Sequence, residues 1–108
     1  IANSVDLVTD LEWYLWQETA KNGISYEKVW QIVNCESGWK EKASGDNSLA
    51  FGLLQYHLPT FNLYKRRYGW EDLDYHNSYD QIKLATKMIG DGYSKEWTCA
   101  RKLYADKI

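Results

Sequence analysis

The chain has 108 residues, of which 44% are hydrophobic and 26% charged, and its formal net charge at pH 7 is −2. This length and balance predict one folded domain over residues 1–108 and exclude a disordered chain. The slightly acidic charge disfavours nucleic-acid binding, and no apolar run approaches the roughly 18 residues that a membrane span needs.

Most of the chain is predicted to form helices joined by short loops, because it has a single proline, Pro59, and few β-branched runs. The expected fold class is all-α, with at most a minimal β-hairpin. A first helix is expected to begin at Ser4 or Asp6, with apolar residues at i, i+3 and i+7 from Val8, and to end before Gly23.

The second helix has clear signals at both ends. Ser25 is a good N-cap for a helix over residues 26–37, and Gly38 is the residue type that commonly ends a helix. The small and polar residues 39–50 that follow predict the longest loop of the chain.

Two more helices are predicted in the middle of the chain. One is expected over residues 59–69. The other begins at Ser78, because Ser78 and Gln81 have the spacing of a capping box, and it ends near Gly90 or Gly92.

A fifth helix is expected to open at Ser94, with Trp97, Ala100 and Tyr104 facing inward. The short basic run at residues 65–67 is the only feature that favours nucleic acid, and we interpret it as a solvated helix face.

Glu36 is the unusual residue of the second helix. It lies three residues after Val33 and seven after Val29, in the middle of the apolar face. One interpretation is a carboxylate that reaches water or pairs with a lysine. The other is a carboxyl whose pKa is raised by burial and by the C-terminal end of the helix, and which can donate a proton near neutral pH. The apolar face also carries Tyr26, Trp30 and Ile32.

The residues after Glu36 carry a resemblance to a known family. Glu36-Ser37, then Ala43-Ser44 in the loop, then Gly52-Leu53-Leu54-Gln55 resemble the motifs of lytic transglycosylases, which have a compact, helical, lysozyme-like fold. The resemblance is close over residues 24–62 and looser over 77–90.

This resemblance implies a role for each matched position. Glu36 would be the catalytic acid and later the base, and Ser37 would orient it or contact the sugar. Gly52 and Leu53 would lie against the saccharide, and Gln55 would hydrogen-bond near the scissile bond. Helix capping by Ser37 and a loop hydrogen bond by Gln55 are the structural alternatives.

The family commonly carries a Tyr-Asn-Ala-Gly stretch whose tyrosine lies near the catalytic glutamate. The nearest segment in this chain is Gly90-Asp91-Gly92-Tyr93, so Tyr93 is a candidate for that position and Tyr75 is another.

Aromatic residues make up 16% of the chain. The same resemblance implies that some of them line a sugar-binding cleft and that the others pack in the core. The rings expected in the cleft are Trp39, Phe51, Tyr56 and Tyr93. Those expected to pack helices together are Trp13, Trp16, Trp70 and Trp97.

The implied reaction cleaves the β-1,4 bond between N-acetylmuramic acid and N-acetylglucosamine and leaves 1,6-anhydromuramoyl ends. The implied partner is a peptidoglycan glycan strand. The protein itself is expected to be a monomer or a domain of a larger wall-associated protein. No cofactor is expected, and neither the cysteines nor His57 and His76 have the spacing of a metal site.

Two alternatives stay open. A muramidase would hydrolyse the same bond with Asp46 as the second carboxylate, although Asp46-Asn47-Ser48 is also typical of a polar turn. The second alternative is a glycan-binding module without catalytic activity. Glu36 argues against it, because binding alone does not require an acid on an apolar helix face.

The two cysteines are Cys35 and Cys99. A wall-degrading enzyme acts in an extracellular, periplasmic or wall-associated location, where disulfides persist. We therefore expect a Cys35–Cys99 bridge that fastens the helix of Glu36 to the last helix; two buried free thiols are the alternative.

Overall fold

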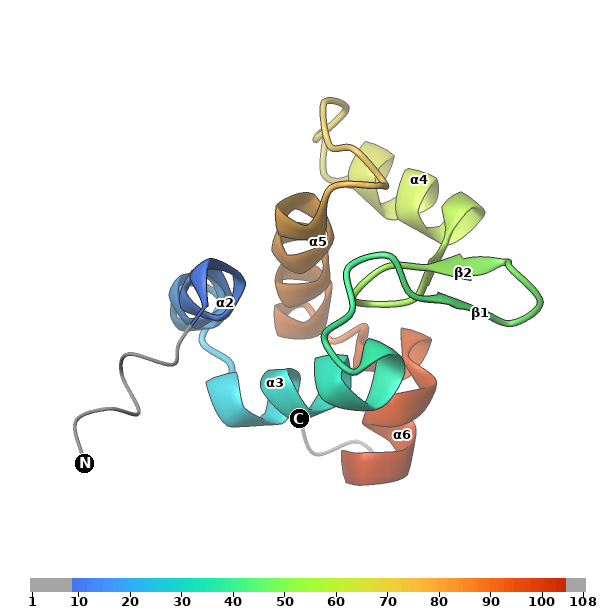
Figure 1. The fold of residues 1–108 in the computed structure, drawn as a ribbon. Coiled ribbons are helices and arrows are strands. Elements are labelled where there is room, and N and C mark those ends of the chain that lie inside the picture. Colours follow the sequence, from blue (N-terminus) through green and yellow to red (C-terminus); the bar gives the residue numbers. More distant parts are fainter. Residues whose placement is uncertain (1–8, 105–108) are drawn as a thin grey trace.

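The computed structural model describes residues 9–104, in which helices dominate (Figure 1). The helices are α2 (Asp10–Lys21), α3 (Tyr26–Ser37), α4 (Leu58–Arg67), α5 (Ser78–Gly90), the 3-10 turn η1 (Ser94–Glu96) and α6 (Thr98–Tyr104). The strands β1 (Ser44–Gly45), β2 (Ala50–Phe51) and β3 (Tyr56–His57) form one small antiparallel sheet in that order. The predicted helical fold is confirmed, and the expected hairpin has a third strand.

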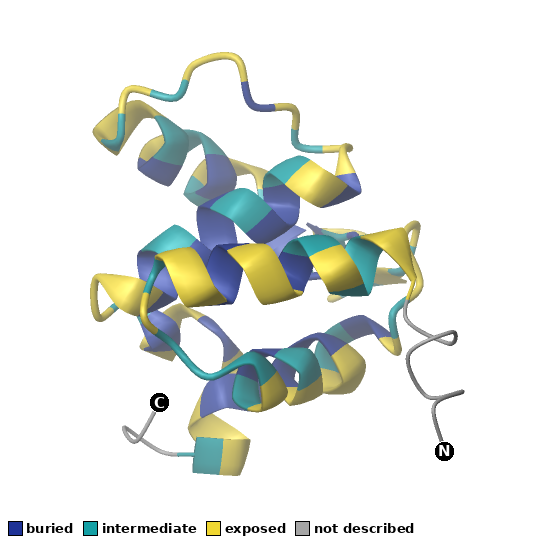
Figure 2. Cartoon of the chain, turned by 90° about the vertical axis from the view of Figure 1, so that its left-hand side faces the viewer, coloured by how far each residue is buried: buried dark blue, intermediate teal, exposed yellow. Residues whose placement is uncertain are grey.

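Helix α5 is the centre of the fold. Most of its residues are buried, with Ile82, Leu84 and Met88 fully enclosed. Helix α2 lies along one side of α5, and α4 packs against it on another (Figures 1 and 2). A helix whose residues are mostly buried is stable only when neighbouring elements cover it in this way.

Helix α2 begins at Asp10. Thr9 is its N-cap in a capping box, in which the Thr9 hydroxyl accepts from the Glu12 N–H and the Glu12 carboxylate accepts from the Thr9 N–H. The expected starts at Ser4 and Asp6, and Val8 with them, lie outside the described residues.

The expectation that Trp13 and Trp16 pack helices together is wrong. Their exposed fractions are 53% and 50%, and the two rings stack on each other with centroids 5.2 Å apart. Helix α2 presents Leu15 to the core, and its opposite face is solvent-exposed (Figure 2). Trp97, by contrast, is 3% exposed and lies in the core as expected. Trp70 is half-buried and packs against the core.

Helix α3 has the predicted bounds. The Ser25 hydroxyl accepts from the Lys28 N–H, and Gly38 ends the helix in the left-handed conformation, with φ 62°. The prediction is confirmed at both ends because each signal is local and needs no tertiary partner.

The start of α5 differs from the prediction. Asn77 is the N-cap and accepts from the Asp80 N–H, while Ser78 is the first helical residue. The side chain of Gln81 does not close a capping box but enters the core, because buried backbone groups of another segment bind it there.

The remaining helices lie close to their predicted positions. Helix α4 begins one residue before Pro59, and Ser94 opens η1 rather than an α-helix; α6 follows from Thr98. Among residues 9–104, no helix is both long and apolar enough to cross a membrane.

Candidate active site

Glu36 lies near the C-terminal end of α3, half-buried, and lines a cleft between α3, α6 and the sheet. The cleft consists of two adjoining cavities of about 390 and 230 Å³. Four residues line both cavities: Gln55, His57, Glu96 and Trp97. Glu36 therefore faces open space large enough for part of a ligand, rather than bulk solvent on the outer face of α3.

One oxygen of Glu36 is held by the last helix. The backbone N–H of Cys99 donates to Glu36 Oε2 at 3.1 Å. The predicted Cys35–Cys99 disulfide is present, with its Cα atoms 6.0 Å apart. It joins α3 to α6, which pack against each other (Figure 1). The bridge thus fastens the donor of the hydrogen bond to the helix that carries the acceptor.

Burial raises the pKa of Glu36 above its ordinary value, and the negative charge of Asp46 acts in the same direction. The Cys99 N–H and the positive charges of Arg101 and Lys102 oppose this shift. The direction agrees with the expectation of a carboxyl that stays protonated at higher pH than an ordinary glutamate.

Asp46 lines the same cavity as Glu36. It belongs to a turn in which Asp46, Asn47 and Ser48 all have positive φ, and its Oδ2 lies 2.9 Å from His57 Nε2. Asp46 is therefore both a turn residue and a carboxylate of the cleft, with His57 of β3 as its partner.

Gln55 reaches the cleft, but its amide nitrogen is used by the loop. Its Nε2 donates to the carbonyls of Ala43 and Gly52, each at 3.0 Å. Its Oε1 lies against Gly45, where a Cβ would come within 2.4 Å. The hydrogen-bond alternative for Gln55 is thus realised, and the side chain also forms part of the cleft wall.

The middle of the Gly-Leu-Leu-Gln motif lies in the protein interior. Gly52 is buried with φ +86°, and a Cβ at this position would lie 2.4 Å from Gln81 Nε2. Leu53 is fully buried. Gly52 therefore permits a close approach to Gln81 rather than the expected approach to a saccharide, and Leu53 has no surface to offer one.

The hydroxyl of Ser37 is occupied by the end of α3. It donates to the carbonyl of Val33 and accepts from the N–H of Trp39, both at 3.2 Å. Ser37 is buried and is not among the residues that line the cleft. The structure thus realises the capping alternative.

Three of the four aromatic rings expected in the cleft lie elsewhere, and Tyr56 lines only its smaller cavity. Tyr56 is 2% exposed, and its hydroxyl contacts the sulfur of Met88, so its ring belongs to the core. Tyr93 packs on Tyr64, Phe51 packs on Tyr75, and Trp39 packs on Trp30 in a separate cavity. The Tyr75 hydroxyl donates to the carbonyl of Tyr56.

Sequence reasoning missed the α6 side of the cleft. Glu96, Trp97, Thr98 and Lys102 line it together with His57. A signal was available, because a Cys35–Cys99 bridge necessarily brings the neighbours of Cys99 next to Glu36. Within residues 9–104, no three His, Cys, Asp or Glu side chains are grouped to hold a metal ion.

A helical domain with a small sheet and one desolvated glutamate facing a cleft belongs to the lysozyme-like class. The family model of the transglycosylase SLT domain matches residues 14–103, and the chain therefore belongs to this family, whose activity is directed at peptidoglycan. No curated protein and no solved structure shows significant similarity to the chain.

Proposed function

We propose that this domain cleaves the β-1,4 bond between N-acetylmuramic acid and N-acetylglucosamine as a lytic transglycosylase, with Glu36 as its single catalytic carboxyl. The observation that carries the proposal is the environment of Glu36, which is half-buried beside a cleft and has a raised pKa. A carboxyl with a raised pKa keeps its proton to higher pH than an ordinary glutamate does and can donate it to a leaving group.

The hydrogen bond from Cys99 assigns different tasks to the two oxygens of Glu36. Because Oε2 accepts the Cys99 N–H, the acidic proton is carried by Oε1. Oε1 donates this proton to the glycosidic oxygen as its bond to the muramoyl C1 breaks. The carboxylate then takes the proton of the C6 hydroxyl as O6 bonds to C1, which yields the 1,6-anhydro end and restores the acid.

The rest of the cleft supplies polar groups for the sugar. Gln55 Oε1, Glu96 and Thr98 offer hydrogen-bonding atoms along its walls, whereas Trp97 is too buried to offer a large stacking face. We infer that hydrogen bonds, more than ring stacking, hold the glycan strand. The proposed substrate and the disulfide both support a location outside the cytoplasm.

The test is Glu36→Gln. Glutamine keeps the size of the side chain and can accept the Cys99 N–H, but it has no acidic proton to donate, so wall-degrading activity should fall about 10²–10⁴-fold. Glu71→Gln, an exposed acid away from the cleft, is the matched control. Mass spectrometry of the digest should find anhydromuramoyl ends; unchanged activity of Glu36→Gln would contradict the proposal.

Hydrolysis by a muramidase mechanism is the second candidate, favoured by one observation. Asp46 lines the cavity of Glu36 and its charge acts on the same carboxyl. In that mechanism Asp46→Asn would abolish activity, and the products would carry reducing ends. The transglycosylase mechanism requires neither result, because the substrate supplies its own nucleophile.

A further inference from the structure

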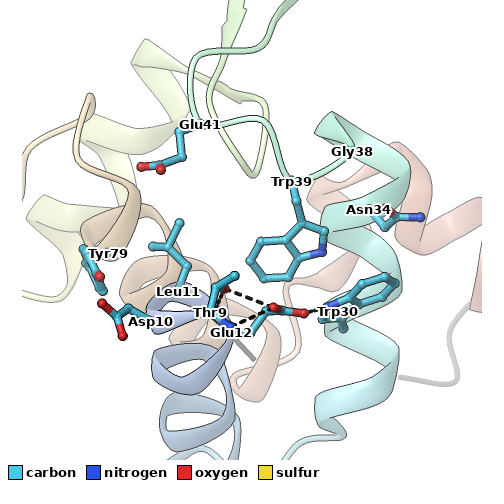
Figure 3. Close-up of a pocket in the computed structure, with 10 residues that line it drawn as sticks. All are labelled: Thr9, Asp10, Leu11, Glu12, Trp30, Asn34, Gly38, Trp39, Glu41 and Tyr79. Atoms are coloured by element: carbon cyan, nitrogen blue, oxygen red, sulfur yellow. Dashed lines mark hydrogen bonds between the residues drawn. The ribbon is translucent and has the colours of Figure 1, made fainter. Parts of the chain in front are cut away.

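A separate cavity, of about 590 Å³, lies beside the C-terminal half of α3 (Figure 3). Asn34 and Gly38 line this cavity, whereas Glu36, two residues from each and therefore on the opposite face of the helix, lines the cleft. It is formed by the start of α2, the end of α3, the loop after α3 and the start of α5. None of its lining residues lines the cleft, and it is larger than either of the cleft's two cavities.

One wall of this cavity is aromatic. Trp30 and Trp39 pack with ring centroids 5.9 Å apart, and Tyr79 lies on the opposite side (Figure 3). The indole N–H of Trp30 donates to Glu12 Oε2 at 2.7 Å, which fixes the ring in place. The wall is therefore preformed and requires little ordering when a ligand arrives.

The cavity also carries three carboxyl groups, from Asp10, Glu12 and Glu41. Glu12 is held by its capping box, and Glu41 Oε1 accepts from the Ser78 hydroxyl at 2.7 Å. Among the described residues that line the cavity there is no Lys, Arg or His. The lining thus has a formal charge of −3 when all three groups are ionised, within a chain of net charge −2.

Carboxylates combined with indole faces fit an organic ammonium ion. Carboxylates attract the charge and accept its N–H groups, and the face of a tryptophan ring attracts a cation that lies over it. A metal ion fits less well, because no acidic group of three in residues 9–104 is placed to coordinate one.

We propose that this acidic and aromatic cavity binds the side-chain ammonium group of the diamino acid in a peptidoglycan stem peptide. The proposal rests on the proposed function, which places the muramoyl sugar in the cleft. It adds a binding site for the branch of the substrate to the site of bond cleavage.

The distance between the two sites suits such a branch. Glu41 lines the cavity and Gly45 lines the cleft. Because these two residues are four apart in sequence, their Cα atoms cannot be more than about 15 Å apart. An extended three-residue stem spans about 10 Å, and its lactyl link and lysine side chain add to that reach.

The experiment titrates the full chain, in its Glu36→Gln form, with N-acetylmuramoyl-L-Ala-D-isoGlu-L-Lys. The indole N–H signals of Trp30 and Trp39 are followed by NMR, after assignment with Trp→Phe variants. Both signals should shift to saturation, and the same peptide acetylated at the lysine amine should bind about tenfold more weakly.

The double variant Asp10→Asn, Glu41→Gln should weaken binding of the free amine by a similar factor, since it removes charge and keeps the shape of the side chains. The matched control is Glu71→Gln, Asp72→Asn, which changes the net charge equally at exposed positions outside the cavity and should bind as the parent does. Thermal unfolding of each variant reports that the fold is kept.

Equal affinity for the free and acetylated peptides, or no effect of the double variant, would overturn the inference. The measurement needs no turnover, so its outcome is separate from that of the proposed function. Anhydro products without discrimination of the amine would refute only the cavity's role; amine-dependent binding by a chain that makes no anhydro ends would refute only the catalytic proposal.

Discussion

At Glu36, burial and hydrogen bonding act in opposite directions on the pKa of one carboxyl. Burial and the charge of Asp46 raise it, while the Cys99 N–H and the charges of Arg101 and Lys102 lower it. The net effect is a raised pKa, and the N–H donor also stabilises the carboxylate that forms once the proton has been transferred. Both states that the proposed reaction requires are thus accommodated by one set of contacts.

Asp46→Asn tests this balance through the pH profile of kcat/KM. Removal of the Asp46 charge lowers the pKa of Glu36, so the acid loses its proton at lower pH. The alkaline limb of the profile should move to lower pH while activity persists in acid. Asp72→Asn, an exposed aspartate away from the cleft, should leave the limb in place; a shift to higher pH in Asp46→Asn would contradict the assignment.

Among the secondary-structure elements, α5 carries one residue, Gln81, whose side chain hydrogen-bonds the segment around residues 51–54. Gln81 is 1% exposed; its Oε1 accepts from the N–H of Leu54, and its Nε2 donates to the carbonyls of Phe51 and Tyr75. These bonds hold the end of β2, the turn after it and the segment before α5 against α5. Gly52 must be a glycine to make room for this side chain.

Gln81→Met should lower the free energy of unfolding by about 3 kcal/mol, because it leaves three backbone groups without their partner at similar side-chain volume. Urea denaturation monitored by circular dichroism measures the change. Gln17→Met makes the same substitution at an exposed position of α2 and should have little effect. A loss for Gln81→Met no larger than that of the control would show that the three bonds contribute little.

For the whole molecule, the disulfide is the main long-range constraint. Cys35 and Cys99 are 64 residues apart in sequence, and their bridge joins α3, which carries the acid, to α6, which carries the N–H donor. It therefore links the stability of the fold to the geometry of the site.

The variant Cys35→Ser, Cys99→Ala should lose about 4 kcal/mol of stability in the chain-entropy treatment of a loop of this length. Its Glu36 should also titrate at higher pH if the Cys99 N–H moves away, since that hydrogen bond lowers the pKa. Denaturation and the kcat/KM profile measure the two effects, and reduced wild-type protein serves as the comparison. A variant as stable as the oxidised parent would contradict the constraint.

The features that depend on local signals can be predicted from the sequence alone. The bounds of α3, the placement of Glu36 on its apolar face and the helical fold class follow from caps and from periodicity, which act within a few residues. The motif around Glu36 also indicated the family, and with it the pairing of Cys35 with Cys99.

Which side chains share the cleft with Glu36 depends on long-range packing and could not be predicted from local patterns. Burial assigned Tyr56 and Leu53 to the core, and one-sided packing left Trp13 and Trp16 exposed on α2. The same applies to Gln81, whose spacing from Ser78 predicted a local cap, whereas two of its three partners lie 27 and 30 residues away. The physical reason is that local propensity is fixed by neighbours in sequence, whereas burial and long-range hydrogen bonds depend on which segments the fold brings together.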